Sequence, residues 1–168
     1  SEYFLFKKKI NLGLDLQGGS YLLLEIDNSP VIEQKLQNLK ISLRNYFKEK
    51  KIRLNNLKIS NQSLSFTVSQ EFKEIVLNEF NDEESNINPY YQRFKMHQYD
   101  VTEKDNQLFL KFSRQGLVEL KTSSQDQALG IVRRRIDEIG TNEPNILKRG
   151  NDRILVELPG LDDPMRIK

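Results

Sequence analysis

The segment YLLLEIDNSPVIEQKLQNLKISLRNYF, residues 21–47, places a strand directly before a long helix. Tyr21–Asp27 is an apolar run of strand length, and the Asn-Ser-Pro triplet that follows it stops the strand. Ser29 can cap a helix, and Pro30 suits the first turn, where no backbone N–H is needed. Apolar side chains then recur at spacings of four, three, four and four, which predicts one buried stripe on an amphipathic helix. The stripe consists of Ile32, Leu36, Leu39, Leu43 and Phe47.

Downstream of this helix the pattern predicts a hairpin, a second helix and a loop. The strands Leu57–Ile59 and Leu64–Val68 flank a polar turn, and the second strand alternates apolar with polar residues. The acidic stretch Asn81–Asn88 is predicted to be a loop. Between them, apolar residues at helical spacing are Phe72, Ile75, Val76, Leu77 and Phe80.

The stretch after this loop has only a weak strand pattern. Tyr90–Val101 alternates only weakly as a strand, through Phe94 and Met96. Glu103–Asn106 has the composition of a turn, and the apolar residues at 108, 110 and 112 predict a better strand after it.

A helix and a hairpin close the pattern. Gly116–Ile139 is predicted to be helical, with Ser123-Ser124 as a point where it could divide and Gly140 as its C-terminal cap. Asn145–Lys148 and Arg153–Leu158 form a hairpin around RGND, with positions 154, 156 and 158 facing inward. The sequence therefore predicts an α+β fold, a ferredoxin-like arrangement of antiparallel hairpins with helices packed on one sheet face.

Composition narrows the function. The 168 residues are 37% hydrophobic and 30% charged, and the net charge is only +2, which does not indicate a polyanion partner. The sequence holds no cysteine and one histidine, His97, so thiolate and histidine-cluster metal sites are excluded. No run approaches the roughly 18 apolar residues of a membrane span, and no signal peptide is recognisable. No catalytic motif is present, so we expect a non-enzymatic protein with no catalytic residues, no metal site and no cofactor.

Two local features could indicate a binding site, but a structural role explains each of them more simply. The glycines around Asp15 could suggest a phosphate loop, but they precede a strand and not a helix. A tight turn is the simpler account, with Asp15 accepting backbone hydrogen bonds. The basic run at 133–135 is expected to be a solvated helix face, with Arg135 in reach of Glu143 or Asp152.

Two longer motifs carry a family resemblance. LGLDLQGG at 12–19, followed by YLLLEID, is similar to the first signature of the SecD protein-export family, although many members carry Arg where Gln17 stands. RRRIDEIGTNEPNILKRGNDRILVELPG at 133–160 resembles the second signature, with departures at Asp137 and Thr141. The matching positions, to which we assign structural roles, are Gly13, Leu14, Asp15, Gly18, Gly19, Arg135, Gly140, Glu143, Pro144, Gly150, Asp152, Arg153, Ile154, Pro159 and Gly160.

The resemblance implies a function that the residues alone do not. SecD is a membrane protein that associates with SecF and the SecYEG channel and assists protein export with the proton-motive force. Its first periplasmic domain has a base and a mobile head and is thought to contact the unfolded preprotein. The resemblance thus implies a bacterial inner-membrane parent, with this chain on the periplasmic side.

By the same resemblance, residues 1–168 would be the base without its head. Residues 1–19 would form the membrane-proximal segment, 20–160 the α+β body, and 161–168 the start of the connection to the head. We expect one sheet edge, which a returning segment of the family's chain would normally cover, to be left open or paired with a neighbouring molecule.

Two other classes remain open from the sequence. One is a soluble α+β ligand-binding or regulatory module unrelated to export, which would need a pocket with convergent polar groups. The other is a nucleic-acid-binding ferredoxin-like domain, which places aromatic side chains on an open sheet face. Phe66 and Phe112 fall in register with aliphatic residues and are predicted to be core, so we expect no nucleic-acid partner.

Overall fold

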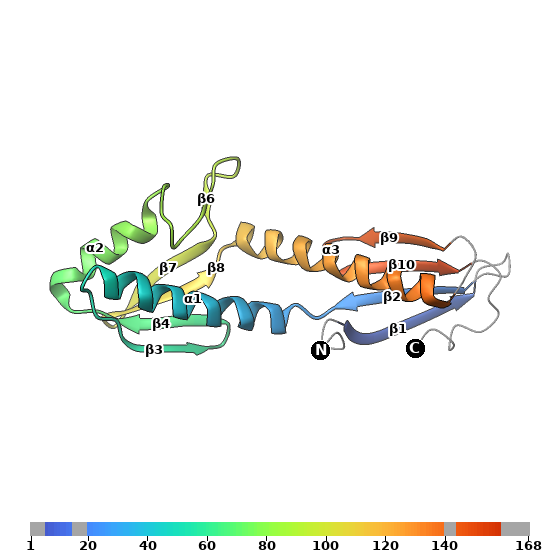
Figure 1. The fold of residues 1–168 in the computed structure, drawn as a ribbon, viewed down its shortest axis with the longest axis horizontal. Helices are drawn as coiled ribbons and strands as arrows, with labels where there is room; N and C mark the ends of the chain where they lie inside the picture. The colour runs from blue at the N-terminus through green and yellow to red at the C-terminus, as the bar shows by residue number, and fades with distance from the viewer. Residues whose placement is uncertain (1–5, 15–19, 140–143, 159–168) are drawn as a thin grey trace. The chain divides into compact units, whose positions relative to one another are not determined.

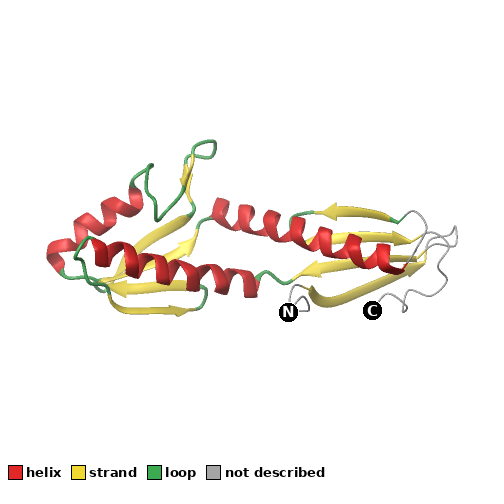
Figure 2. Cartoon of the chain, in the orientation of Figure 1, coloured by secondary structure: helices red, strands yellow, loops and turns green. Residues whose placement is uncertain are grey.

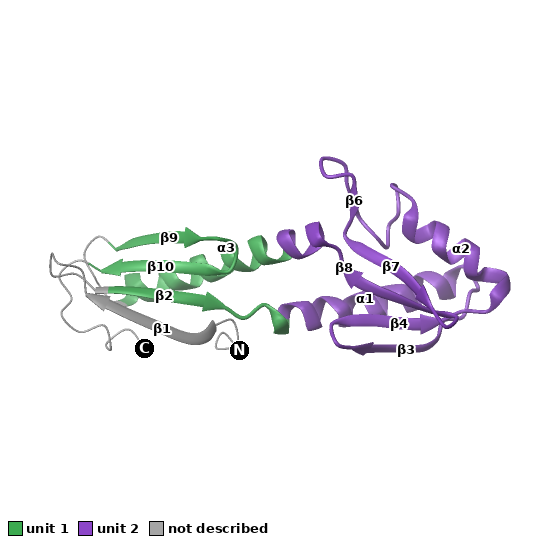
Figure 3. Ribbon diagram, turned by 180° about the vertical axis from the view of Figure 1, so that it is seen from behind, with its two compact units in different colours: residues 1–30, 120–168 green, residues 31–119 purple. Residues whose placement is uncertain are grey.

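The computed structural model describes residues 6–14, 20–139 and 144–158 and has the predicted α+β class, with antiparallel sheets and helices packed against them. The chain divides into two compact units, which Figure 3 shows in two colours: unit 1, residues 1–30 and 120–168, and unit 2, residues 31–119. The elements are β1 (Phe6–Leu14), β2 (Ser20–Ile26), α1 (Ser29–Glu49), β3 (Asn55–Ser60), β4 (Ser63–Thr67), α2 (Gln70–Asn81), β5 (Tyr90–Tyr91), β6 (Met96–His97), β7 (Tyr99–Lys104), β8 (Gln107–Phe112), α3 (Arg114–Ile139), β9 (Asn145–Arg149) and β10 (Arg153–Leu158). None of the helices in the described ranges is long and apolar enough to cross a bilayer.

Unit 1 is a four-stranded antiparallel sheet with one helix on one face. The strand order is β1-β2-β10-β9, and α3 runs along the sheet in Figure 1. β2 and β10 pair in a register that sets Leu24 opposite Ile154 and Leu22 opposite Val156. Because alternate strand residues face the same side, this register aligns the apolar sets of both strands under the helix. The buried core consists of Ile26, Ala128, Val132, Ile136, Ile154, Val156 and Leu158.

Unit 2 is a second antiparallel sheet, of order β3-β4-β8-β7, with α1 and α2 beside it (Figure 2). At its centre is an aromatic cluster to which α1, α2 and β4 each contribute one ring. Phe80 of α2 lies 6.1 Å from Phe47 of α1 and 6.2 Å from Phe66 of β4, measured between ring centroids. All three side chains are fully buried, so the cluster joins both helices to the sheet.

Most elements follow the sequence pattern. All five residues of the predicted α1 stripe are buried, and Phe66 and Phe112 lie in the core as expected. The two-residue turns of the β3–β4 and β7–β8 hairpins have positive φ at Asn61 and Gln62 and at Asp105 and Asn106, which matches the twist of a tight hairpin. The inward-facing positions predicted for β10 are buried as well.

Four details differ from the sequence interpretation. α3 runs unbroken through Ser123 and Ser124, and the latter is buried. Phe94 lies in the turn between the short strands β5 and β6, not in a longer strand. β1 was not anticipated, because its lysine-rich first half hides the alternation. β2 pairs with β1 and β10, so it lies in a different sheet from the β3–β4 hairpin.

A polar network fixes the return of the chain from α2 to β7. The buried Asn88 side chain donates from Nδ2 to the carbonyls of Phe80 (2.9 Å) and Tyr99 (3.0 Å), and its Oδ1 accepts from the Tyr99 N–H (2.9 Å). The ring nitrogens of His97 lie 3.0 and 3.2 Å from the carbonyl oxygens of Asn88 and Asn81. The lone histidine therefore has backbone partners, in keeping with an ordinary structural residue.

The start of α3 depends on a close backbone approach. The Ser113 hydroxyl accepts from the Gly116 N–H (3.0 Å) and donates to the His97 carbonyl (2.6 Å), which is an N-cap anchored to β6. A Cβ at Gly116 would lie 2.2 Å from the Gln98 carbonyl oxygen. A Cβ at Gly130, in the same helix, would meet nothing within 4 Å.

We therefore expect opposite effects from the same substitution at these two glycines. Gly116→Ala should lower the free energy of unfolding by roughly 1–3 kcal/mol, because the backbone must move to accommodate the methyl group. Gly130→Ala should raise it by up to about 1 kcal/mol, because alanine is the better helix former. Urea unfolding followed by circular dichroism measures both. Equal effects of the two substitutions would contradict the close approach at Gly116.

A charged contact joins α1 to α2. The Glu79 carboxylate accepts hydrogen bonds from the Lys50 ammonium and the Tyr46 hydroxyl, and the Glu79 side chain is 23% exposed. The hydrogen bond from Lys50, followed by that from Tyr46, holds the pKa of Glu79 below its ordinary value of 4.5. Because the pKa of Glu79 is lower in the folded protein, the contact stabilises the fold when the pH is above the ordinary pKa of the carboxyl group. This contribution is lost as the pH falls through the folded-state pKa.

Glu79→Gln should consequently make unit 2 less sensitive to acid. At neutral pH we expect a loss of under about 1 kcal/mol, because the pair is partly solvated. The difference from wild type should shrink as the pH is lowered below about 4.5. Glu74→Gln, at an exposed position of the same helix, is the matched control. Unfolding curves at several pH values test this, and a difference that does not change with pH would count against the contact.

Candidate functional site

The second sequence motif forms the β9–β10 hairpin of unit 1. Gly150, in the turn, has a φ of +61°, a backbone conformation that residues with a side chain rarely adopt. The carbonyl of Asp152 accepts a hydrogen bond from the Ile26 N–H at 2.7 Å, which connects the turn to the end of β2. Ile154 is fully buried at the start of β10. These motif positions therefore set the turn and its attachment to the sheet.

Gln125 of α3 holds the same turn from the helix side. Its side chain is only 2% exposed, and its Nε2 donates to the carbonyls of Gly150 (3.0 Å) and Arg153 (2.8 Å). A buried amide with two backbone acceptors is worth more than a surface contact, because removing it leaves polar groups with fewer partners in a dry site. The sequence interpretation did not single out Gln125. Its position on the apolar side of a predicted helix was the one available signal.

Charged side chains around the hairpin are solvated. Lys148 of β9 pairs with Asp126 of α3, and Arg153 lies 3.7 Å from the Asp152 carboxylate. The Asp152 side chain is 35% exposed and that of Arg153 is 52% exposed. Pairs of this kind contribute at most about 1 kcal/mol each. They orient the hairpin surface and do not form a charged reaction centre.

The other motif residues fall into three groups. Gly13 and Leu14 lie at the end of β1, and Pro144 directly precedes β9. Arg135 is exposed on α3. The positions outside the described residues are Asp15, Gly18, Gly19, Gly140, Glu143, Pro159 and Gly160. The contact expected between Arg135 and Glu143 therefore stays a prediction.

The sheet face opposite α3 carries an apolar row. Leu155 of β10 is paired with Leu23 of β2 on one side and Leu147 of β9 on the other. Since Ile154 and Val156 face the helix, these three leucines face the opposite side. Leu23 and Leu155 are half-buried, and Leu147 is 37% exposed. We call Leu23, Leu155 and Leu147 the leucine row.

Polar rows flank the leucine row on both sides. On one side Arg153 pairs in register with Glu25 and with Arg149. On the other, Glu157 pairs with Tyr21, and it accepts a hydrogen bond from the Asn145 amide at 2.6 Å. An apolar stripe with charged borders is suited to binding extended chains that carry apolar side chains, and it offers no chemistry for bond making or breaking.

A hollow of about 350 Å³ lies at the end of α3, lined by Arg133, Asp137, Pro144, Asn145 and Ile146. The described lining residues offer one cation, one carboxylate and no nucleophile. Across the described ranges, no group of three or more His, Cys, Asp or Glu side chains is arranged to hold a metal ion.

Comparison with known proteins assigns the two motifs. Residues 3–30 match the family model described as the SecD/SecF GG motif, and residues 125–168 match the N-terminal part of the P1 domain of protein translocase subunit SecDF. Both matched models describe parts of protein translocase subunits. No solved structure matches the chain.

The relatives are consistent with this class over nearly the whole chain. The chain is 35% identical to protein translocase subunit SecD of Rickettsia bellii over 98% of its length, and 32% identical to that of Acetobacter pasteurianus over 96%. It belongs to the SecD family. It spans 30% of the length of each of these two curated relatives.

Removing the Gln125 amide should loosen the β9–β10 turn. Gln125→Leu keeps the side-chain volume but removes two hydrogen bonds, and we expect a loss of roughly 1–3 kcal/mol. Gln127→Leu, at an exposed position of the same helix, should change stability by less than about 0.5 kcal/mol. Amide hydrogen exchange at residues 149–154 and urea unfolding test this. Unchanged exchange in the Gln125 variant would show that the amide does not hold the turn.

Proposed function

We propose that this chain acts as a non-enzymatic periplasmic part of a Sec translocon auxiliary complex, assisting preprotein export driven by the proton-motive force. One observation carries the proposal: strands from the two family motifs pair in one sheet. The matched residues 3–30 include β1 and β2, the matched residues 125–168 include β9 and β10, and β2 pairs with β10 along its length. The two signatures are thus parts of a single folded unit.

In this proposal the parent protein is embedded in the bacterial inner membrane and works with SecF and SecYEG. The chain forms the base of the first periplasmic domain and supports a mobile head, to which residues 161–168 begin the connection. β9 and β1 are the edge strands of the described sheet. We propose that a segment of the parent protein pairs with one of these edges, since an uncovered edge presents unpaired N–H and C=O groups.

The surface proposed to contact the emerging preprotein is the leucine row. An unfolded chain exposes apolar side chains, which gain about 25 cal/mol for each Å² of apolar surface removed from water. The row offers partly exposed apolar area on a strand-paired scaffold. Its charged borders, Glu25 and Arg153 on one side and Glu157 on the other, keep the face hydrated when no chain is bound.

Site-specific crosslinking in cells tests this surface. A photo-crosslinking amino acid at position 155 of the full-length protein should capture an exported protein whose translocation has been arrested. The same amino acid at position 75 is the matched control, because Ile75 is also an exposed apolar residue, 46% exposed, but lies on α2. Capture at 155 and not at 75 is the expected result.

Two results would count against the proposal in different ways. Equal capture at both positions would mean that the leucine row has no special part in contacting preprotein. Unchanged export rates in cells lacking the full-length protein would contradict the export function itself. The ligand-binding module would then replace it as the working hypothesis.

A further inference from the structure

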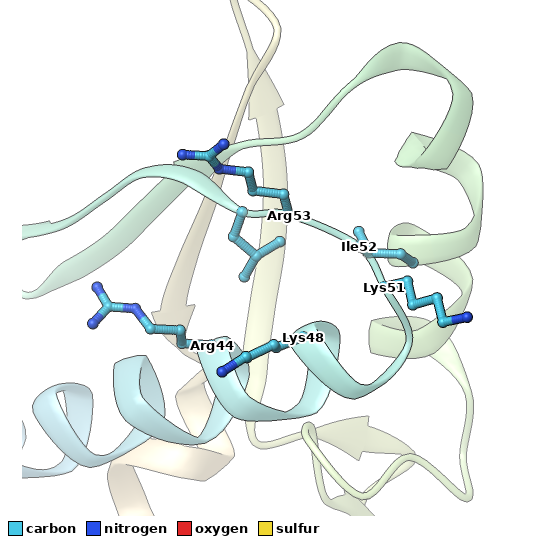
Figure 4. A pocket seen from close by; sticks show the side chains of 6 residues that line it. Arg44, Lys48, Lys51, Ile52 and Arg53 are labelled. Carbon is cyan, nitrogen blue, oxygen red and sulfur yellow. The ribbon is translucent and has the colours of Figure 1, made fainter.

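A basic pocket lies in unit 2, where α1 ends and β3 begins. It has a volume of about 360 Å³ and is lined by Arg44, Lys48, Lys51, Ile52, Arg53 and Leu54. Figure 4 shows the side chains of Arg44 and Lys48 rising from α1, with that of Arg53 opposite them on the returning chain. In the same view the Lys51 ammonium points the other way. The three cations that share one side of the pocket are therefore Arg44, Lys48 and Arg53.

The end of α1 creates this arrangement. Lys51 has a φ of 60°, its N–H donates to the Lys48 carbonyl (3.0 Å), and the Ile52 N–H donates to the Phe47 carbonyl (2.8 Å). This is a Schellman cap, which reverses the chain in a fixed geometry. Ile52 is only 5% exposed and anchors the reversal in the core. Arg53 is thus returned toward the last turns of the helix by backbone structure.

The cap also removes an obstacle to anion binding. The C-terminus of a helix normally presents free carbonyl oxygens, which carry partial negative charge. Here the carbonyls of Tyr46, Phe47 and Lys48 each accept a backbone hydrogen bond beyond the regular helix. An anion beside the last turn therefore meets side-chain cations and few free carbonyl oxygens.

The three cations on this side of the pocket make no ion pair with another described residue. Lys50, directly after the same helix, pairs with Glu79, whereas no ion pair between the described residues involves Arg44, Lys48 or Arg53. Arg44 and Lys48 are four residues apart on a helix, a spacing at which like charges repel. The whole sequence carries a net charge of only +2, so this positive charge is a local concentration.

We infer that this pocket binds a phosphate group. A phosphate monoester carries close to two negative charges and three acceptor oxygens, which suit two guanidinium forks and one ammonium better than a single carboxylate does. Leu54 also lines the pocket and provides an apolar surface for a carbon attached to the phosphate. Free phosphate and a soluble phosphate monoester offer this chemistry, and the phosphodiester headgroup of an anionic lipid offers a singly charged form of it.

The test measures binding to the 168-residue chain directly, so it does not depend on the export function. Inorganic phosphate and glycerol phosphate are titrated at low ionic strength and followed by NMR chemical shifts. Vesicles of phosphatidylglycerol are compared with vesicles of phosphatidylcholine by flotation. We expect at least one probe to bind: either saturable shifts at residues 44, 48, 53 and 54 with a soluble phosphate, or flotation with phosphatidylglycerol vesicles.

Charge-matched variants separate the pocket from general positive charge. The variant Arg44→Gln, Lys48→Gln, Arg53→Gln should weaken binding at least about tenfold, because each lost contact is charge-assisted. The variant Lys35→Gln, Lys58→Gln, Lys104→Gln removes the same charge at exposed positions and should change binding less than about twofold. Arg53→Gln alone, with far-ultraviolet circular dichroism as a folding check, should weaken binding in the same direction.

Each outcome decides the inference. Saturable binding of the soluble probes that is lost in the pocket variant supports a free phosphate or ester as ligand. Binding to phosphatidylglycerol vesicles alone, lost in the same variant, supports a lipid headgroup. No binding to any probe, or an equal loss in both triple variants, would overturn the inference.

Discussion

The packing of α3 onto β2 and β10 is the interaction on which unit 1 depends. Four antiparallel strands need one covered face, and Ala128, Val132 and Ile136 supply the cover over Ile154 and Val156. Gln125 extends the same helix face into a polar contact that fixes the β9–β10 turn. With one face closed in this way, the opposite face is left to the leucine row. The stability of the unit and its proposed contact surface thus have one origin.

The family matches coincide with one of the two units. They cover residues 3–30 and 125–168, which lie in unit 1, and they leave unit 2 outside. The relatives nevertheless align over nearly the whole chain, so unit 2 is present in them as well. Unit 2 has its own aromatic core around Phe80 and its own polar network around Asn88. Unit 2 therefore has its own core and can carry a binding site separate from the sheet of unit 1.

The sequence predicted those features that arise from local periodicity. The α1 stripe and the β9–β10 hairpin were predictable, because helical spacing and turn composition act over a few residues. The pairing of β2 with β10 was not, since no local pattern identifies a partner at the other end of the chain. The leucine row was hidden for the same reason: Leu23, Leu147 and Leu155 become neighbours only once the register is known. The structural role of Gln125 was not predicted, because a glutamine in a helix is usually exposed at the surface.

The order of segments along the chain has a consequence for how the protein matures. Unit 2 is one continuous stretch, whereas the sheet of unit 1 needs β2 from before that stretch and β10 from after it. A polypeptide that emerges with its N-terminus first therefore completes unit 2 before β10 is available to pair with β2. A two-stranded ribbon of β1 and β2 is at best marginally stable by itself, and pairing between distant segments is slow. During that interval the apolar strand Ser20–Ile26 has no β10 partner, and its exposed apolar side chains make the incomplete chain prone to aggregation.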